Sequence, residues 1–460
     1  MSKKNLSRRN FISKAALGIS GTALSTLAGA SVVSAAANTS MSASSYKRII
    51  GANDRINIGF LGCGHRSSGH QNMVKMSIKD KNLGVIAVCD LWSQNREKTA
   101  ANCKKLYDAD VKQFKYSEDM LKMPQLDAVM IGTGDFQHAK ILSEVVKAGK
   151  DCYCEKPMAQ DVGEAKMARE TVLSSKQVVQ MGSQWLSDPT QIKIRDFVRS
   201  GKLGKITKIE QSWNDNNHRW HDANRPEVAA IKEDDTDWNR WLLGKPWCPF
   251  DPWKYFEFRI FREFSGGITS QWMSHAIGLV HFYTDTNIPD SMVANGGIFG
   301  WHDIRQNPDT FEALATYDDP EFLYSYSSSY ANKFGDYSCI RGKDGTLFAQ
   351  GGEGSPRWFF IPEHTKDFDF YTGFGEAIKS GEAELIADKD QFNGNLPPTG
   401  LSDDSKPHLD NWIDCMRSRN QNTNGNIHTG FAHSVGQIMA TKAYRENKKI
   451  YWDRSKEEIV

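Results

Sequence analysis

The sequence has 460 residues, which is enough for two or three domains that each bury a core of their own. Its 57 basic and 56 acidic side chains leave a formal net charge of +1, so no overall electric field favours nucleic acid or an anionic membrane as a partner. The 8 cysteines contain no CxxC pair and no Cys/His spacing typical of a zinc finger, which predicts buried free thiols and no structural metal.

Residues 1–37 have the layout of a signal peptide, in which basic residues precede a weakly apolar run that ends in small side chains. The segment SRRNFI around Arg8 and Arg9 resembles the twin-arginine motif, which predicts export of the folded protein to the periplasm. An ordinary Sec signal and an uncleaved anchor are the alternatives, although Gly, Ser and Thr in the apolar run argue against a stable membrane span. Residues 38–54, rich in Ser and Asn, are predicted to be a linker.

A short aliphatic strand, Ile56–Leu61, leads into a glycine-rich turn and then a helical pattern. Gly62 permits the tight turn, and Gly64 lets the backbone approach a pyrophosphate at the helix N-terminus, where free N–H groups favour anions. Ser67 stands where the dinucleotide fingerprint has its third glycine, so the turn alone also fits a loop without a ligand. The next cofactor-binding candidates in this turn are His65 and Arg66.

A second apolar strand, residues 84–89, ends in Asp90, which lies 28 residues after Gly62. Its carboxylate would accept a hydrogen bond from the 2′-hydroxyl of an adenosine ribose and repel a 2′-phosphate, which favours NAD over NADP. The alternative is an aspartate that merely ends a strand. Strands and helices then continue to alternate as far as about residue 154, a pattern typical of a parallel sheet with helices on both faces.

Thr133 and His138 follow the strand 128–131, and the turn Glu155-Lys156-Pro157 follows the strand 151–154. Together with the glycine turn and the acid at the end of the second strand, these segments resemble the Gfo/Idh/MocA oxidoreductase family over roughly residues 55–450. The resemblance implies an NAD site that includes Thr133, His138, Glu155 and Lys156. Lys156 would reach both the nicotinamide and a substrate hydroxyl.

The resemblance also implies the domain organisation. Residues 55–184 would form a Rossmann domain of the α/β class. Residues 185–460 would form a substrate-binding and oligomerisation domain of the α+β class with an open, mostly antiparallel sheet. Its C-terminal helices would pack back on the Rossmann domain, and the outer face of its sheet would meet a partner subunit in a homo-oligomer, a dimer or a tetramer.

Proton transfer is assigned to Lys156 and His275. A lysine between a cationic nicotinamide ring and a low-dielectric wall should have a lowered pKa, and it would then accept the hydroxyl proton as hydride leaves. Many family members carry an Asp four residues before the histidine, where this chain has Gln271. The sequence therefore predicts a site without its orienting carboxylate. The alternative for His275 is a histidine packed in a core.

Aromatic and hydrogen-bonding residues of the second half suggest a carbohydrate or glycoside substrate, because aromatic faces stack on sugars and Arg, Asp and Asn pair with vicinal hydroxyls. The substrate-binding candidates are Gln184, Trp185, His218, Arg219, His221, Arg259 and Gln271. Core packing is the better explanation for most of the tryptophans. The i, i+3 spacing of His218 and His221 could suit a metal, but no nearby carboxylate cluster supports one.

These observations predict an NAD-dependent dehydrogenase that acts on a secondary hydroxyl of a sugar or glycoside. Because the periplasm has no known pool of free NAD, the cofactor should be tightly bound and recycled in place. One alternative is an NAD-dependent glycosidase that oxidises C3, eliminates the aglycone and re-reduces the ring. Another is a sugar-binding protein without catalytic activity on the same fold.

Overall fold

The computed structural model describes residues 54–350, 357–363, 373–388 and 405–460. The predicted signal peptide and all but the last residue of the predicted linker lie outside the described residues. No helix in the described part of the chain is both long enough and apolar enough to cross a membrane.

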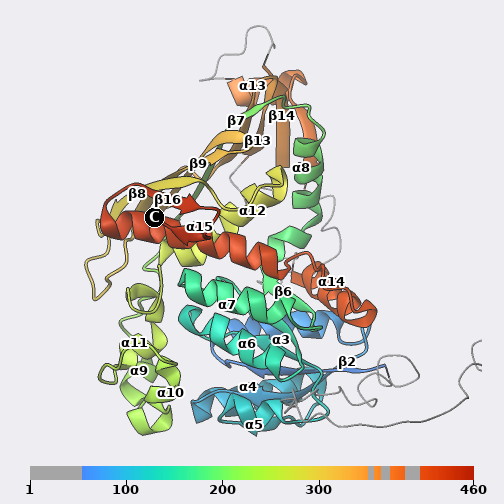
Figure 1. Ribbon diagram of the computed structural model, residues 1–460, viewed down its shortest axis with the longest axis vertical. Helices are drawn as coiled ribbons and strands as arrows, with labels where there is room; N and C mark the ends of the chain where they lie inside the picture. Colours follow the sequence, from blue (N-terminus) through green and yellow to red (C-terminus); the bar gives the residue numbers. More distant parts are fainter. Residues whose placement is uncertain (1–53, 351–356, 364–372, 389–404) are drawn as a thin grey trace, which may run out of the picture. The chain divides into compact units, whose positions relative to one another are not determined.

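The first sheet is parallel and has six strands in the order β3-β2-β1-β4-β5-β6 (Figure 1). The strands are β1 Ile56–Leu61, β2 Leu83–Cys89, β3 Lys112–Phe114, β4 Ala128–Ile131, β5 Asp151–Glu155 and β6 Val179–Gly182. The helices between them are α3 His65–Ser77, α4 Ser93–Tyr107, α5 Ser117–Leu121, the short η1 Asp135–Gln137, α6 His138–Lys147 and α7 Val162–Leu173. Strands β1, β4 and β5 are almost wholly buried, as expected for near-continuous apolar runs covered on both faces. This arrangement confirms the predicted Rossmann fold.

The second sheet has 11 strands, in the order β15-β14-β13-β12-β7-β10-β9-β8-β16-β17, with β11 paired to β7. The strands are β7 Ile206–Asn216, β8 Ser291–Gly297, β9 Thr310–Asp318, β10 Glu321–Ser329, β11 Ala331–Asn332, β12 Ser338–Gly342, β13 Gly345–Gln350, β14 Arg357–Pro362, β15 Glu384–Asp388, β16 Ile450–Asp453 and β17 Glu458–Ile459. Strands β7 and β10 pair in parallel, and the other pairs are antiparallel. The open, mostly antiparallel sheet that was predicted is confirmed.

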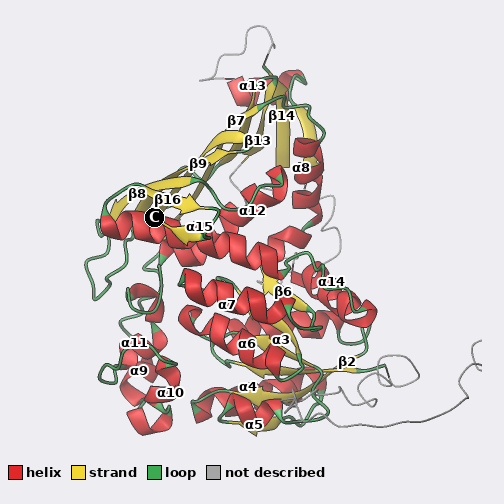
Figure 2. Ribbon diagram, viewed as in Figure 1, coloured by secondary structure: helices red, strands yellow, loops and turns green. Residues whose placement is uncertain are grey.

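Helices of the second half pack on this sheet and on the Rossmann domain (Figure 2). They are η2 Gln184–Ser187, α8 Pro189–Arg199, the π-helical turn η5 Thr269–Met273, α12 Ser274–Thr284, α13 Gly373–Ser380, α14 Ser405–Ser418 and α15 Ile427–Glu446. Helix α15 packs on both β8 and α7, and α14 packs on α3. The indole N–H of Trp412 donates to the Val178 carbonyl at 3.1 Å, so buried polar contacts as well as apolar side chains join α14 to the Rossmann sheet.

An aromatic segment, residues 226–264, separates β7 from η5. It contains α9 Pro226–Ala230, η3 Glu233–Asp235, α10 Trp238–Leu242, α11 Pro252–Phe256 and η4 Phe258–Ile260. Its aromatic side chains form a core of their own with Trp92 and Phe136 of the Rossmann domain. The segment is therefore attached at the carboxyl edge of the parallel sheet, where ligands of such sheets bind.

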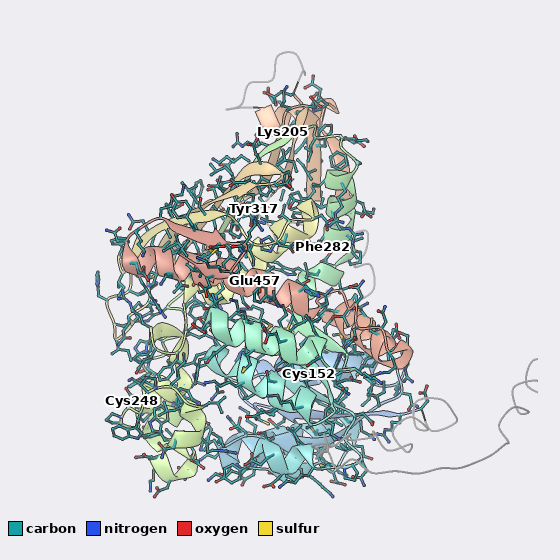
Figure 3. All side chains as sticks on the ribbon, viewed as in Figure 1. Cys152, Lys205, Cys248, Phe282, Tyr317 and Glu457 are labelled. Atoms are coloured by element: carbon teal, nitrogen blue, oxygen red, sulfur yellow. The ribbon has the colours of Figure 1, made fainter. Side chains whose placement is uncertain are left out.

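All 8 cysteines lie in the described residues and are free. Cys152 is buried in β5, whereas Cys248 of the aromatic segment is partly exposed (Figure 3). Burial raises the pKa of the Cys152 thiol well above its usual value, so this group packs as a small apolar side chain.

Candidate active site

A cavity of about 1710 Å³ runs between the carboxyl edge of the Rossmann sheet, the aromatic segment and the start of α12. Binding sites for a single small molecule usually measure roughly 300–1,000 Å³, so this cavity can hold a dinucleotide together with a second molecule. Its wall includes most of the predicted cofactor and substrate residues, among them Gly62, Asp90, Lys156 and His275.

The glycine turn has the geometry that a pyrophosphate requires. Gly62 has a φ of +86°, and a Cβ there would lie 2.7 Å from the backbone of Gly132 and Thr133. At Gly64 a Cβ would meet no atom within 4 Å, so the space beside the turn is open. Helix α3 begins at His65 without a side-chain cap and without an acidic residue in its first turn. Free N–H groups and the helix dipole therefore face an open cradle that suits an anionic group.

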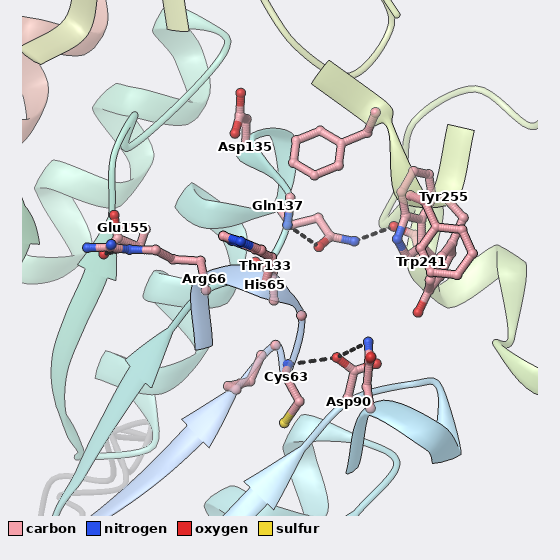
Figure 4. Close-up of a pocket in the computed structure, with 18 of the residues that line it drawn as sticks. Cys63, His65, Arg66, Asp90, Thr133, Asp135, Gln137, Glu155, Trp241 and Tyr255 are labelled. Carbon is pink, nitrogen blue, oxygen red and sulfur yellow. Dashed lines mark hydrogen bonds and ion pairs between the residues drawn. The ribbon is translucent and has the colours of Figure 1, made fainter. Parts of the chain in front are cut away.

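Asp90 lies at the adenosine end of this cradle (Figure 4). Its Oδ2 accepts a hydrogen bond from the Cys63 N–H at 2.7 Å, and its Oδ1 accepts one from the Trp92 N–H at 2.9 Å. Because each carboxylate oxygen has two acceptor positions, Oδ1 can also accept a ribose hydroxyl. Burial raises the pKa of Asp90, and the backbone hydrogen bonds oppose that rise. Asp90 thus fixes the glycine turn as well as facing the cavity.

Glu155 is the centre of a buried polar cluster below the cradle. Its Oε1 accepts hydrogen bonds from Arg66 Nε at 2.7 Å, His70 Nε2 at 3.0 Å and Gln184 Nε2 at 3.3 Å. Burial opposes ionisation of Glu155, but the charge of Arg66 and the bond from His70 hold its pKa well below the usual range. Gln184 also donates to the Tyr153 hydroxyl at 2.6 Å. Arg66, Glu155 and Gln184, which the sequence predicts to contact cofactor or substrate, line the cavity and are hydrogen-bonded to one another through Glu155.

His138 connects two loops of the cavity wall. Its Nδ1 lies 2.7 Å from the Pro157 carbonyl oxygen, and its Nε2 lies 3.2 Å from the Thr133 carbonyl oxygen. Both ring nitrogens are therefore directed at protein, and His138 holds the turn after β5 against the end of β4. The hydroxyl of Thr133 is buried and has no partner among the described residues, which leaves one wall group available to the cofactor.

Lys156 projects into the cavity from the turn after β5. Its Nζ donates to the carbonyl oxygens of Gln271, at 2.7 Å, and Ser270, at 3.3 Å, on η5. Burial lowers the pKa of Lys156 from 10.5 to about 8, although the nearby Asp135 carboxylate raises it. The lowered pKa expected from the sequence is therefore present before any cofactor charge is added.

His275 opens α12 beside this lysine. Burial and the positive charge of Lys156 lower its pKa well below the usual value, so the ring is neutral near pH 7. The Trp185 ring packs against it at 5.1 Å between centroids, and the Trp213 ring lies 5.2 Å from Trp185. Trp185, which the sequence predicts to contact substrate, is not among the residues that line the cavity. Its ring packs at an angle against His275.

A carboxylate is present beside Lys156, contrary to the prediction from Gln271. Asp135 of η1 is buried, and its Oδ2 accepts hydrogen bonds from Gln271 Nε2 at 2.5 Å and from Ser265 Oγ at 2.7 Å. Gln271 Oε1 in turn accepts one from Arg259 Nε at 3.2 Å. The expectation failed because it considered only one position on one helix, whereas the Rossmann domain brings a carboxylate to the same place from another element.

The remaining sugar-binding candidates, His218, Arg219 and His221, also line the cavity. His218 Nε2 lies 2.5 Å from Asp303 Oδ2, and Arg219 pairs with Asp215 at 3.1 Å. The Arg219 guanidinium lies over the Trp272 ring at 5.4 Å, and His221 also faces the cavity. No three His, Cys, Asp or Glu side chains of the described residues form a group that could hold a metal ion.

The aromatic segment is joined to the Rossmann domain by several polar contacts. Gln137 Nε2 donates to the Trp241 carbonyl at 2.5 Å, and Lys140 Nζ donates to the Leu243 carbonyl at 3.0 Å. Figure 4 shows Gln137 between the glycine turn and the rings of Trp241 and Tyr255. The segment therefore forms a wall across from the glycine turn.

Comparison with known proteins agrees with this geometry. Residues 56–183 match the model of the Gfo/Idh/MocA oxidoreductase family, described as an NAD-binding Rossmann fold. This segment is therefore similar to the NAD-binding domain of that family. A solved levoglucosan dehydrogenase in complex with NADH is similar over 86% of this chain and 98% of its own, with a TM-score of 0.63 and 12% identity, which shows a shared fold.

Curated relatives match a smaller part of the chain. An inositol 2-dehydrogenase/D-chiro-inositol 3-dehydrogenase of Lactiplantibacillus plantarum is 26% identical over 193 residues, which are 41% of this chain and 52% of its own. A protein named glycosyl hydrolase family 109 protein from Shewanella baltica is 25% identical over 219 residues, 45% of this chain and 46% of its own. The chain thus spans about half the length of these relatives.

Two residues of the cavity wall were not predicted from the sequence. They are Asp135 and Trp272, which lies beneath Arg219. Asp135 could have been found, because it follows β4 at the carboxyl edge of the parallel sheet, the edge at which such sheets bind ligands. Nothing in the local sequence of Trp272 separates it from the buried aromatic residues around it.

Proposed function

We propose that this protein is an exported, NAD-dependent oxidoreductase that acts on a secondary hydroxyl of a sugar or glycoside. The observation that carries the proposal is the Lys156 amine, which has a pKa of about 8 and lies in the wall of the dinucleotide cavity next to His275. A lysine with a pKa near the working pH can accept a hydroxyl proton, which an ordinary surface lysine cannot do efficiently.

When bound, NAD would supply the hydride acceptor for the carbon that carries the hydroxyl. Neutral Lys156 takes the hydroxyl proton at Nζ. Because its N–H groups donate to the carbonyls of Ser270 and Gln271, the lone pair can point toward the cavity. Neutral His275 lines the same cavity and is the proposed relay for that proton. Asp135 orients Gln271 and stabilises the lysine after protonation.

Tight retention of NAD is part of the same proposal. The aromatic segment, residues 226–264, forms part of the cavity wall and is hydrogen-bonded to Gln137 and Lys140 of the Rossmann domain, which would help to retain a dinucleotide. A retained cofactor suits a protein exported in the folded state, which the basic and apolar pattern of residues 1–37 supports. Replacing both Arg8 and Arg9 with Lys should keep the protein out of the periplasmic fraction.

A homo-oligomer is also proposed. Val293 on β8 and Leu314 on β9 are directly paired across the outer face of the second sheet, with exposed fractions of 38% and 43%. Neighbouring exposed aliphatic side chains of this kind suit a second copy of the chain. Sedimentation of the purified protein tests this directly, and a monomer at all concentrations would contradict it.

The second candidate is a redox-neutral, NAD-dependent glycosidase. It is favoured by the similarity to the family 109 glycosyl hydrolase and by a cavity that can retain a cofactor through a complete oxidation and re-reduction. The chemistry requires a further base for the C2 hydrogen. No side chain of the described cavity wall is marked for that role by its pKa and position together.

One experiment separates these candidates. The mature protein is purified, NAD released by heat is measured, and the protein is incubated with free sugars and with nitrophenyl glycosides. Accumulating NADH or a keto-sugar supports the dehydrogenase. Nitrophenol without net NADH supports the glycosidase and overturns the simple dehydrogenase. Bound NAD with neither product supports a protein that binds sugars without turning them over.

A further inference from the structure

Five arginines line the cavity, and four of them form ion pairs. The pairs are Arg66 with Glu155, Arg219 with Asp215, Arg225 with Glu257, and Arg240 with Glu118. Arg259 has no carboxylate partner among the described residues. A guanidinium removed from water is costly unless a counter-charge is supplied, so the fifth arginine is the unusual one.

The contacts of Arg259 with the described residues leave the two terminal nitrogens of its guanidinium group free for a ligand. Its Nε donates to Gln271 Oε1 at 3.2 Å, and its Cζ lies over the Phe258 ring at 4.3 Å from the centroid. The two terminal nitrogens have no acceptor in the described part of the chain. Burial lowers the pKa of Arg259, but a guanidinium stays charged at any working pH. These nitrogens can form two parallel hydrogen bonds to one carboxylate.

The charges around the reacting end of the cavity also favour an anion. Arg259 is a cationic group without an ion-pair partner among the described residues, and the carboxylates of Asp135 and Glu257 act on it only from a distance. Asp135 Oδ2 already accepts hydrogen bonds from uncharged groups, including Ser265 and Gln271. An oxidised nicotinamide would add a further positive charge. A neutral substrate would leave Arg259 without a paired carboxylate.

We propose that the substrate is a sugar acid or a glycoside of one, and that its carboxylate binds the terminal nitrogens of Arg259. Gln271 lies one helical turn before His275 and touches Arg259, so the carboxylate would lie near the hydroxyl that is oxidised. The inference rests on the proposed function, because it names the substrate class of that site. It adds no chemical step to the hydride and proton transfer described above.

The test compares matched acidic and neutral sugars on the NAD-loaded protein. The probes are glucuronate and galacturonate, the methyl esters of both acids, and glucose and galactose. Binding is followed by calorimetry, and reduction of the bound cofactor is followed by the absorbance of NADH. The acids should bind about tenfold more tightly, or better, than both the esters and the neutral sugars.

Variants assign this preference to one side chain. Arg259→Gln should abolish the preference for the acids and leave binding of the esters within about twofold. Arg259→Lys should keep part of it, because a point charge replaces the planar fork. Arg240→Gln is the matched control, since it removes the same group from the rim of the cavity, and it should leave the preference unchanged.

The outcomes distinguish the inference from the function it deepens. Preferential binding of the acids without NADH would support the anionic site and contradict the oxidoreductase. Neutral sugars that bind and reduce the cofactor as well as the acids would support the oxidoreductase and overturn the anionic site. Equal losses of binding affinity for acids and esters in Arg259→Gln would also overturn the anionic site. Failure of every probe to bind would contradict both the anionic site and the oxidoreductase.

Discussion

Replacing Lys156 with Met should remove a buried charge that the folded protein tolerates only at a cost. The pKa of Lys156 falls from 10.5 to about 8 on folding, mainly through burial. At ~1.4 kcal/mol per pKa unit, holding the charged form in the folded state costs roughly 3 kcal/mol. Met has a similar length and no charge, so Lys156→Met is free of this cost while losing the proposed proton acceptor.

The sign of the pH dependence follows from the lowered pKa. The cost is complete below about pH 8, where Lys156 is charged in both states, and it disappears as the pH rises toward the unfolded value of 10.5. The free energy of unfolding of the wild type should therefore rise relative to that of Lys156→Met by roughly 3 kcal/mol across this interval. At pH 7 the loss of hydrogen bonds to Ser270 and Gln271 offsets the variant's gain by about 1 kcal/mol each.

Urea unfolding of both proteins without cofactor, followed by tryptophan fluorescence at several pH values between about 7 and 10, measures this difference. All groups other than residue 156 titrate in both proteins and largely cancel. A difference in unfolding free energy that does not change with pH would refute the reasoning, because it would mean that the lysine titrates alike in the folded and unfolded states.

Three further predictions concern other parts of the site. Asp135→Asn should shift the midpoint of the pH profile for reduction of bound NAD below about 8, because this carboxylate raises the pKa of Lys156. An unmoved midpoint would leave Asp135 a purely structural role. Trp92→Ala should hasten the loss of NAD on gel filtration by about tenfold, since the aromatic segment packs on this ring. Trp247→Ala is the control, because Trp247 of that segment is 67% exposed and its removal should not hasten the loss. Equal retention of NAD by both variants would contradict a role of the aromatic segment in holding the cofactor. Gly62→Ala should abolish NAD binding, because its Cβ would lie 2.7 Å from backbone atoms. Gly149→Ala is the control: Gly149 has a comparable φ of +75° with no atom within 4 Å, so this change should cost only about 1–2 kcal/mol of unfolding free energy. Similar losses of NAD binding in both variants would point to backbone strain alone.

The sequence by itself determined the Rossmann half of this protein. The strand before Gly62, the acid at position 90 and the turn at Lys156 are local patterns in which each residue acts through its own backbone geometry or through its place at a strand end. Such patterns survive without knowledge of the rest of the fold. The lowered pKa of Lys156 was also predictable, because burial near the cofactor follows from its position.

Only the tertiary structure decided what surrounds that lysine. The carboxylate beside Lys156 is that of Asp135, which lies far in sequence from Gln271. The ring of Trp185, predicted to contact substrate, packs against His275. The unpaired state of Arg259 is likewise a property of every neighbour at once. Contacts of this kind depend on packing between elements distant in the chain, and no spacing pattern in the sequence encodes them.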